Sequence, residues 1–91
     1  MPKYSVVYVK SAEKKLYSLE QHTAERIAKK IEYYSKTGDP LSEAKSLSGI
    51  MKGLYRYRVG DYRIIFSIDS KATISILTIL DIAHRKDIYR K

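Results

Sequence analysis

Residues 54–66 read LYRYRVGDYRIIF, and this stretch decides the fold of the chain. On both sides of Gly60-Asp61, aromatic or branched apolar residues alternate with arginine. Successive side chains of a strand face opposite sides of a sheet, so this alternation predicts strands that are half apolar and half cationic. Glycine at the first position of a two-residue loop suits a type II′ turn. We therefore expect a β-hairpin with strands Leu54–Val59 and Tyr62–Ile68.

A two-residue turn also predicts the register of the hairpin. Val59 pairs with Tyr62, and Arg58 then pairs with Arg63. The apolar side chains of both strands share one face, which we expect to pack against helices. Arg56, Arg58 and Arg63 share the other face.

The pairing of Arg58 with Arg63 breaks a local rule of sheet formation. Cβ atoms of directly paired residues lie roughly 5 Å apart, and like charges so placed are destabilising. Such conflicts concentrate at functional sites. An anion between the two guanidinium groups would turn repulsion into attraction, and the planar fork of arginine matches phosphate oxygens. The alternative is two long side chains that extend into water from an exposed sheet face.

The rest of the chain supplies helices and two further strands. Strands are expected at Tyr4–Val9 and Thr73–Leu80, because these segments are short and rich in aromatic and β-branched residues. A first helix follows Ser11, a plausible N-cap, and a second runs from about Thr23 to Tyr34 with one apolar stripe.

The remaining segments are connections. Thr37-Gly38-Asp39-Pro40 should end the second helix. A short helical turn is expected near Glu43–Leu47, and Ile82–Lys91 is a short charged tail. The fold class is α+β: two N-terminal helices packed on one face of a mostly antiparallel four-stranded sheet, in the order β-α-α-β-β-β. Ninety-one residues form one domain, 1–91.

Composition narrows the classes of function. The chain has no cysteine, so disulfides and thiolate zinc sites are excluded, and the lone histidines His22 and His84 predict no metal cluster. We expect no cofactor. The apolar run Ile74–Leu80 is too short to span a bilayer, which makes the cytoplasm the expected location. The net charge of +8 points to an anionic partner such as nucleic acid.

The charged tail reads His84-Arg85-Lys86-Asp87-Ile88-Tyr89-Arg90-Lys91. The tail contains further cationic side chains. Beside them are two residues, His84 and Tyr89, that can transfer a proton or stack on a base.

The hairpin and the tail together resemble the RelE/ParE toxin superfamily, and its RelE branch in particular. Lys45-Ser46-Leu47-Ser48-Gly49 also fits this resemblance, which covers nearly the whole chain. It implies the toxin of a type II toxin–antitoxin system, an endoribonuclease that cleaves mRNA in the ribosomal A site. The implied partners are mRNA, the ribosome and a RelB-like antitoxin with an acidic or amphipathic segment; no membrane is implied.

The resemblance also implies roles for individual residues. It assigns catalysis to Arg56, Arg58, Arg63, Arg85 and Tyr89, with His84 as a further possibility. We assign RNA binding to four other cations: Lys45, Lys52, Lys86 and Arg90. Some RelE proteins carry lysine where this chain has Arg56 and Arg58.

Cleavage by attack of the ribose 2′-OH needs charge stabilisation and two proton transfers. The arginines suit charge stabilisation, because a pKa above about 12 keeps them protonated and unable to act as a base. Proton transfer then falls to Tyr89, as the resemblance implies, or to His84, whose ordinary pKa of about 6.5 suits it better. Two other functions remain open: a ParE-like toxin that inhibits gyrase, and an RNA-binding module without catalysis.

Overall fold

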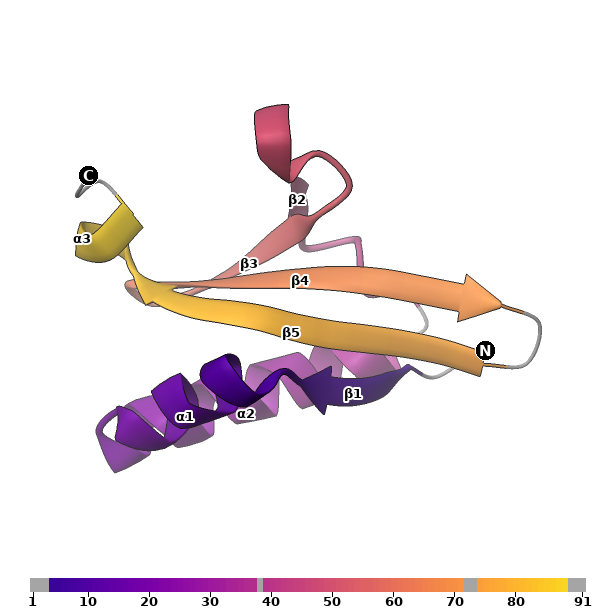
Figure 1. The fold of residues 1–91 in the computed structure, drawn as a ribbon. Coiled ribbons are helices and arrows are strands. Elements are labelled where there is room, and N and C mark those ends of the chain that lie inside the picture. Colours follow the sequence, from indigo (N-terminus) through magenta and orange to yellow (C-terminus); the bar gives the residue numbers. More distant parts are fainter. Residues whose placement is uncertain (1–3, 38, 72–73, 89–91) are drawn as a thin grey trace.

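The computed structural model describes residues 4–37, 39–71 and 74–88. Figure 1 shows the arrangement of its helices and strands. In chain order they are β1 (Ser5–Tyr8), α1 (Lys10–Ser18), α2 (Gln21–Lys36), β2 (Lys45–Ser46), the 3₁₀ turn η1 (Gly49–Met51), β3 (Tyr55–Val59), β4 (Tyr62–Lys71), β5 (Ile74–His84) and α3 (Arg85–Ile88).

The sheet is mixed and five-stranded, in the order β1-β5-β4-β3-β2. The expected four-stranded, mostly antiparallel sheet was therefore wrong in its number of strands. β1 runs parallel to β5, with Ser5 opposite Ile76 and Tyr8 opposite Ile79, and the other pairs are antiparallel. The additional strand, β2, has only two residues, which is too short for alternation to reveal it. It lies where a helical turn was expected at Glu43–Leu47, so that prediction was wrong as well.

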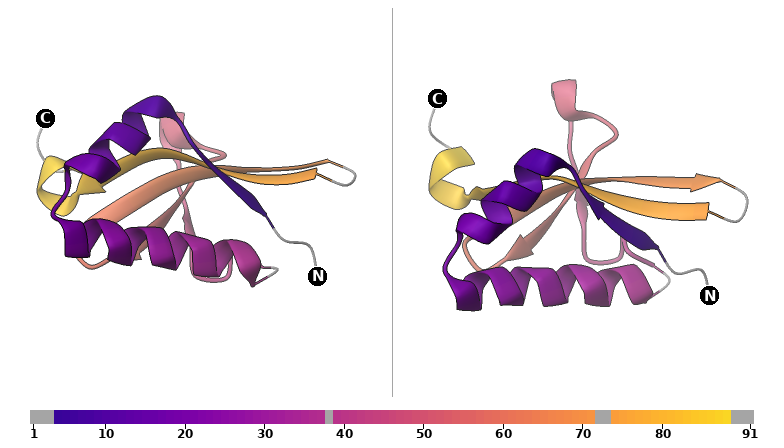
Figure 2. Two further views of the ribbon diagram at one scale, coloured as in Figure 1. Left: turned by 90° about the horizontal axis from the view of Figure 1, so that it is seen from below. Right: turned by 60° about the horizontal axis from the view of Figure 1, so that its bottom comes forward.

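Both N-terminal helices cover one face of this sheet, as predicted, while η1 and α3 lie on the other side (Figures 1 and 2). The apolar stripe of α2 and the apolar face of the hairpin meet in a single core. Its buried members are Ala12, Leu16, Ile27, Ile31, Tyr34, Tyr57, Val59, Ile64, Phe66, Leu77, Ile79 and Ile82. The face that the alternation of residues 54–68 assigned to the core is thus the face that the helices cover.

The helix starts differ from those expected. Ser11 lies inside α1, whose N-cap is Val9 without a side-chain hydrogen bond. The carboxylate of Glu20 caps α2 by accepting the backbone N–H of Thr23 at 3.1 Å, so this helix begins at Gln21 rather than Thr23. It ends at Lys36, two residues after the expected Tyr34, and its C-cap Thr37 is the first residue of the Thr37-Gly38-Asp39-Pro40 stretch that predicted a stop.

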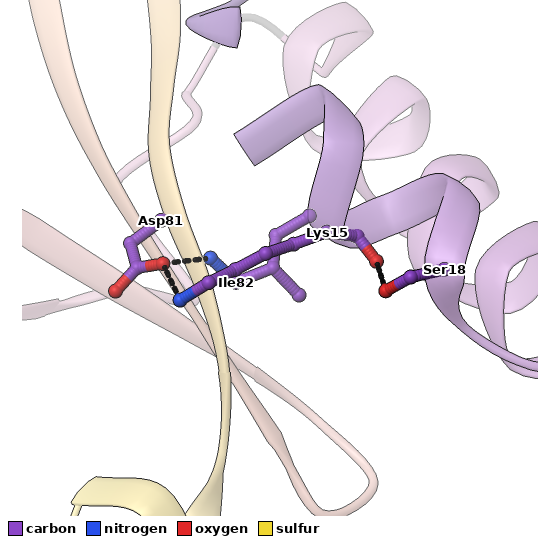
Figure 3. A network of polar contacts seen from close by, with 4 residues as sticks. All are labelled: Lys15, Ser18, Asp81 and Ile82. Atoms are coloured by element: carbon purple, nitrogen blue, oxygen red, sulfur yellow. Dashed lines mark hydrogen bonds and ion pairs between the residues drawn. The ribbon is translucent and has the colours of Figure 1, made fainter. Parts of the chain in front are cut away.

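α1 is joined to the sheet where the β4–β5 pairing is irregular. The register shifts between Ile65 and Phe66, whose partners are Asp81 and Ile79. Asp81 Oδ1 accepts hydrogen bonds from Lys15 Nζ at 2.7 Å and from the Ile82 N–H at 2.9 Å (Figure 3). Lys15 in turn accepts the Ser18 hydroxyl at its carbonyl, at 2.7 Å. The ion pair is about half exposed and therefore contributes little to stability, so α1 is held against the sheet mainly by its buried residues Ala12 and Leu16.

An aromatic stack fills the core under the hairpin. The Tyr57 ring stacks between Tyr34 and Phe66, with centroid distances of 4.2 Å to each. Its hydroxyl donates to the carbonyl oxygen of Pro40 at 2.6 Å, which ties the loop after α2 to β3. Burial raises the pKa of Tyr57 well above its ordinary value. The phenol therefore stays protonated in the folded protein at pH values where an unfolded tyrosine ionises.

Tyr57→Phe tests both parts of this description. It should lower the free energy of unfolding by about 1–3 kcal/mol at pH 7, because the buried Pro40 carbonyl loses its donor. Since the folded pKa is raised, the unfolded chain releases a proton first, and wild-type stability falls above about pH 10. The difference between variant and wild type should therefore shrink at alkaline pH in urea titrations. Tyr17→Phe, at a side chain that is mostly exposed, is the control and should change nothing at pH 7.

Candidate functional site

The hairpin has the predicted register. Val59 lies opposite Tyr62, and Arg58 lies directly opposite Arg63. Gly60 has a φ of 59°, the left-handed conformation that glycine adopts at no steric cost. Arg56 lies opposite Ile65, on the same face as the other two arginines. The alternation and the turn thus place three guanidinium groups on the face that the helices leave uncovered.

A third cation joins the Arg58–Arg63 pair from the C-terminal segment. Arg58, Arg63 and Arg85 line a hollow of about 360 Å³, together with the turn residues Gly60, Asp61 and Tyr62; we call it the arginine hollow. Arg58 is exposed, and Arg63 is half-buried. Coulomb repulsion among three guanidinium groups makes this hollow favourable for an anion.

Asp61 brings Arg85 to the arginine hollow. The backbone N–H of Arg85 donates to the carbonyl oxygen of Asp61 at 2.7 Å, and its guanidinium lies 3.8 Å from the Asp61 carboxylate. This is possible because β5 continues to His84 and α3 starts at Arg85. The last strand was expected to end at Leu80 and the charged tail to begin at Ile82; this boundary was wrong, since residues 82–84 complete β5.

Arg56 belongs to an adjoining hollow of about 150 Å³. Its lining residues are Glu43, Lys45, Arg56 and Arg58. Lys45 reaches it because β2 pairs Lys45 with Arg56. Arg58 lines both hollows, so one cationic surface runs from Lys45 to Arg85 along the uncovered face.

His84 lies on the other face of the sheet. It is the register partner of Tyr62, and the two rings meet edge to face with centroids 5.1 Å apart. Its Nδ1 accepts the backbone N–H of Lys86 at 3.1 Å, which caps the start of α3. His84 therefore does not line the arginine hollow.

The other predicted residues are only partly placed. Lys86 is exposed on α3, and Lys52 is exposed directly after η1; neither lines the arginine hollow. Tyr89 and Arg90 lie outside the described residues.

Sequence reasoning missed three residues around the site. Asp61 was expected only to form the turn, yet it holds Arg85. Glu43 adds a carboxylate to the hollow of Arg56. Arg26 on α2 was given no role, yet its guanidinium lies against Gly60: a Cβ on that glycine would lie 3.1 Å from Arg26 Nη1. Of these three residues, only Asp61 had a sequence signal, which is its position inside the hairpin turn.

The site is cationic and contains no recognisable metal ligand set. Within residues 4–37, 39–71 and 74–88, no group of three or more His, Cys, Asp or Glu side chains could hold a metal ion. None of the helices described there is long and apolar enough to cross a membrane. Three arginines around a hollow can bind an anionic group and stabilise negative charge that develops on it.

A family model described as "ParE toxin of type II toxin-antitoxin system, parDE" matches residues 6–89. The chain belongs to the ParE toxin family. No curated protein sequence matches it. Its wider membership of the RelE/ParE superfamily, which the hairpin and the tail predicted, is confirmed by this match and by the solved structures that resemble the toxin.

Three solved toxin–antitoxin complexes contain similar chains. The RelBE2 complex of Mycobacterium tuberculosis has a TM-score of 0.76 and 25% identity, over 93% of this toxin and 94% of that chain. The RelE–RelB complex of Pyrococcus horikoshii gives 0.69 and 28% over 91% and 96% of the two chains. The RelB–RelE complex of Methanococcus jannaschii gives 0.69 and 26% over 91% and 94%. A YoeB/ParE toxin from Agrobacterium tumefaciens, 16% identical, shares the fold with a TM-score of 0.71.

The position of Arg58 leads to a prediction about the stability of the toxin. Arg58→Ala should leave the free energy of unfolding within about 0.5 kcal/mol of wild type, or raise it, because the side chain is exposed and faces a like charge. Any gain should fade in 1 M salt, which screens the repulsion. Urea denaturation at low and high salt measures both. A loss above about 1 kcal/mol would show that Arg58 is needed for folding.

Proposed function

We propose that this toxin is an endoribonuclease that cleaves mRNA, in the ribosomal A site, by attack of the ribose 2′-OH on the adjacent phosphate. The observation that carries the proposal is the arginine hollow, where Arg58 and Arg63 oppose each other and Arg85 is added by a hydrogen bond to Asp61. A phosphate ligand would account for two guanidinium groups that face each other on the open face of the sheet.

The arginines would stabilise the charge that gathers on the phosphoryl oxygens as the 2′-oxygen attacks. The sheet register and the contact of Arg85 with Asp61 place these side chains around one hollow before the substrate arrives, which would reduce the reorganisation required in the transition state. They cannot take the proton from the 2′-OH, because they remain protonated. Arg56 and Lys45 would bind the RNA backbone next to the reacting phosphate.

Proton transfer needs a different residue. His84 faces away from the arginine hollow, and its Nδ1 is engaged with the backbone of Lys86. This placement supports Tyr89 as the group that transfers a proton. Cations nearby would favour its phenolate.

The proposal includes an antitoxin partner. The chain has a net charge of +8, and the similar chains from M. tuberculosis, P. horikoshii and M. jannaschii were solved in complex with RelB-type antitoxins. We therefore propose a RelB-like antitoxin whose acidic or amphipathic segment covers the cationic surface and blocks access to RNA.

A second candidate function is inhibition of DNA gyrase by protein contact. The matching family model is that of ParE toxins, which favours this possibility. Protein contact with gyrase does not require arginines that face each other around a hollow, so this function would not explain the arginine hollow. The third candidate function is RNA binding without cleavage. It would use the same cations and would differ from the proposed function only in leaving the RNA intact.

Cleavage of mRNA on programmed ribosomes distinguishes these candidates. Wild-type toxin should produce new mRNA 3′ ends in the A-site codon, and Arg58→Ala should cut roughly 10²-fold more slowly, as when one preorganised charge-stabilising group is removed. Lys29→Ala, an exposed cation on α2 away from the site, is the matched control. Binding without new ends would favour the RNA-binding module. Loss of supercoiling in a parallel gyrase assay, without cleavage, would favour the ParE-like function.

Substitutions of Tyr89 separate proton transfer from stacking. Tyr89→Phe keeps the ring and removes the hydroxyl, so single-turnover cleavage should fall by about 10²–10⁴-fold while ribosome binding changes little. If the ring only stacks on a base, Tyr89→Phe will cleave at a near-native rate and Tyr89→Ala will not, which would contradict the assignment. His84→Ala, measured beside them at saturating ribosome, should lose far less of the cleavage rate than Tyr89→Phe.

A further inference from the structure

A second hollow lies across the β3–β4 turn from the arginine hollow. It encloses about 150 Å³ and faces α2; we call it the helix-side hollow. Its lining residues are Thr23, Arg26, Ile27, Val59, Gly60, Asp61, Tyr62 and His84. Gly60, Asp61 and Tyr62 line both hollows, so this turn is the wall that they share.

Arg26 is the cation of the helix-side hollow. It is exposed on α2, and its guanidinium lies so close to the turn that a Cβ at Gly60 would be 3.1 Å from Nη1. Within residues 4–37, 39–71 and 74–88 it forms no ion pair. Glycine at position 60 therefore has two effects: it permits the turn and it leaves room for this guanidinium.

His84 supplies a second donor to the same hollow. Its Nδ1 accepts the Lys86 N–H, so the neutral ring carries its hydrogen on Nε2. Thr23 contributes only a wall, because its N–H and its hydroxyl both donate to the Glu20 carboxylate. The one carboxylate that lines the hollow, Asp61, lies 3.8 Å from the guanidinium of Arg85, which offsets part of its charge. The side-chain donors that line the hollow, apart from Thr23, are therefore the guanidinium of Arg26, the imidazole of His84 and the hydroxyl of Tyr62.

We propose that the helix-side hollow is a second phosphate-binding site, which holds the RNA strand one or more nucleotides away from the phosphate in the arginine hollow. The inference rests on the proposed function. A guanidinium fork with an imidazole N–H matches the oxygens of a phosphodiester, and a hollow this small suits a phosphate rather than a nucleoside. Because the two hollows share the turn as a wall, one strand that crosses Gly60-Asp61 reaches both. Arg26 then positions the RNA and takes no part in the chemistry.

The test is binding of a 2′-O-methyl decaribonucleotide, which keeps the phosphates but lacks the nucleophile. Fluorescence anisotropy gives the affinity of the toxin for this RNA between about 50 and 200 mM salt, the range in which affinity that depends on phosphate contacts falls steeply. Each contact in a single strand adds about 0.7 to the slope of log K against log salt. Arg26→Ala should reduce that slope by about 0.7 and weaken binding roughly tenfold.

Two further variants serve as controls for the result with Arg26→Ala. Lys29→Ala removes one charge from the same helix, beside a different groove lined by Tyr4 and Val6, and should change the affinity by less than about twofold. Arg58→Ala reports on the arginine hollow. If Arg26→Ala matches Lys29→Ala while Arg58→Ala binds more weakly, the second site is wrong and the proposed function stands. If neither arginine matters, or wild type does not bind at 50 mM salt, both proposals fail.

Folding of the variants is checked by thermal denaturation. Arg26→Gln keeps most of the side-chain packing against Gly60 and removes the charge. If Arg26→Ala is destabilised, Arg26→Gln replaces it, and the same loss of slope is expected. A full slope in a folded Arg26→Gln would show that the guanidinium only packs on the turn, which overturns the second site.

Discussion

The two-residue turn at Gly60-Asp61 is the constraint on which the site depends. Its length sets Val59 opposite Tyr62, and every other pairing in the hairpin follows, including Arg58 opposite Arg63. A shift of one residue would bring arginines to the helix side and move Tyr57 and Phe66 out of the core. The burial of Tyr57, Ile64 and Phe66 and the exposure of the arginine face are therefore consequences of the same register.

The turn also connects three elements that are far apart in the sequence. Its carbonyl at Asp61 holds α3 through Arg85, and its glycine accommodates Arg26 of α2. The apolar side of the hairpin supplies the stability that lets its other side carry like charges close together. Tyr57 illustrates this division: its ring is stacked between two aromatic side chains, while its neighbours Arg56 and Arg58 face the opposite way. The arginine hollow is thus supported by the hydrophobic core on the opposite face of the same hairpin.

The hairpin was predictable because alternation and turn chemistry are local. The predicted strands Leu54–Val59 and Tyr62–Ile68 contain enough residues for a period of two to be recognised, and the turn length then fixes the pairing. Lys45–Ser46 carries too few, and the parallel pairing of β1 with β5 joins segments about seventy residues apart that no local pattern relates. The cap of α2 was missed because glutamate is not among the preferred capping residues. Arg26 was missed because its role comes from its distance to a glycine on another element.

The parallel pairing of β1 with β5 has a consequence for synthesis of the chain. β1 is held in the sheet by residues 76–79, about seventy residues further along the chain. On the ribosome, β1 and α1 must therefore wait for β5, since α1 packs mainly against that strand and Lys15 meets its partner only at Asp81. Such long-range closure delays folding until β5 has been made. The nascent polypeptide that carries the arginines consequently lacks a finished scaffold until residues 76–79 are available.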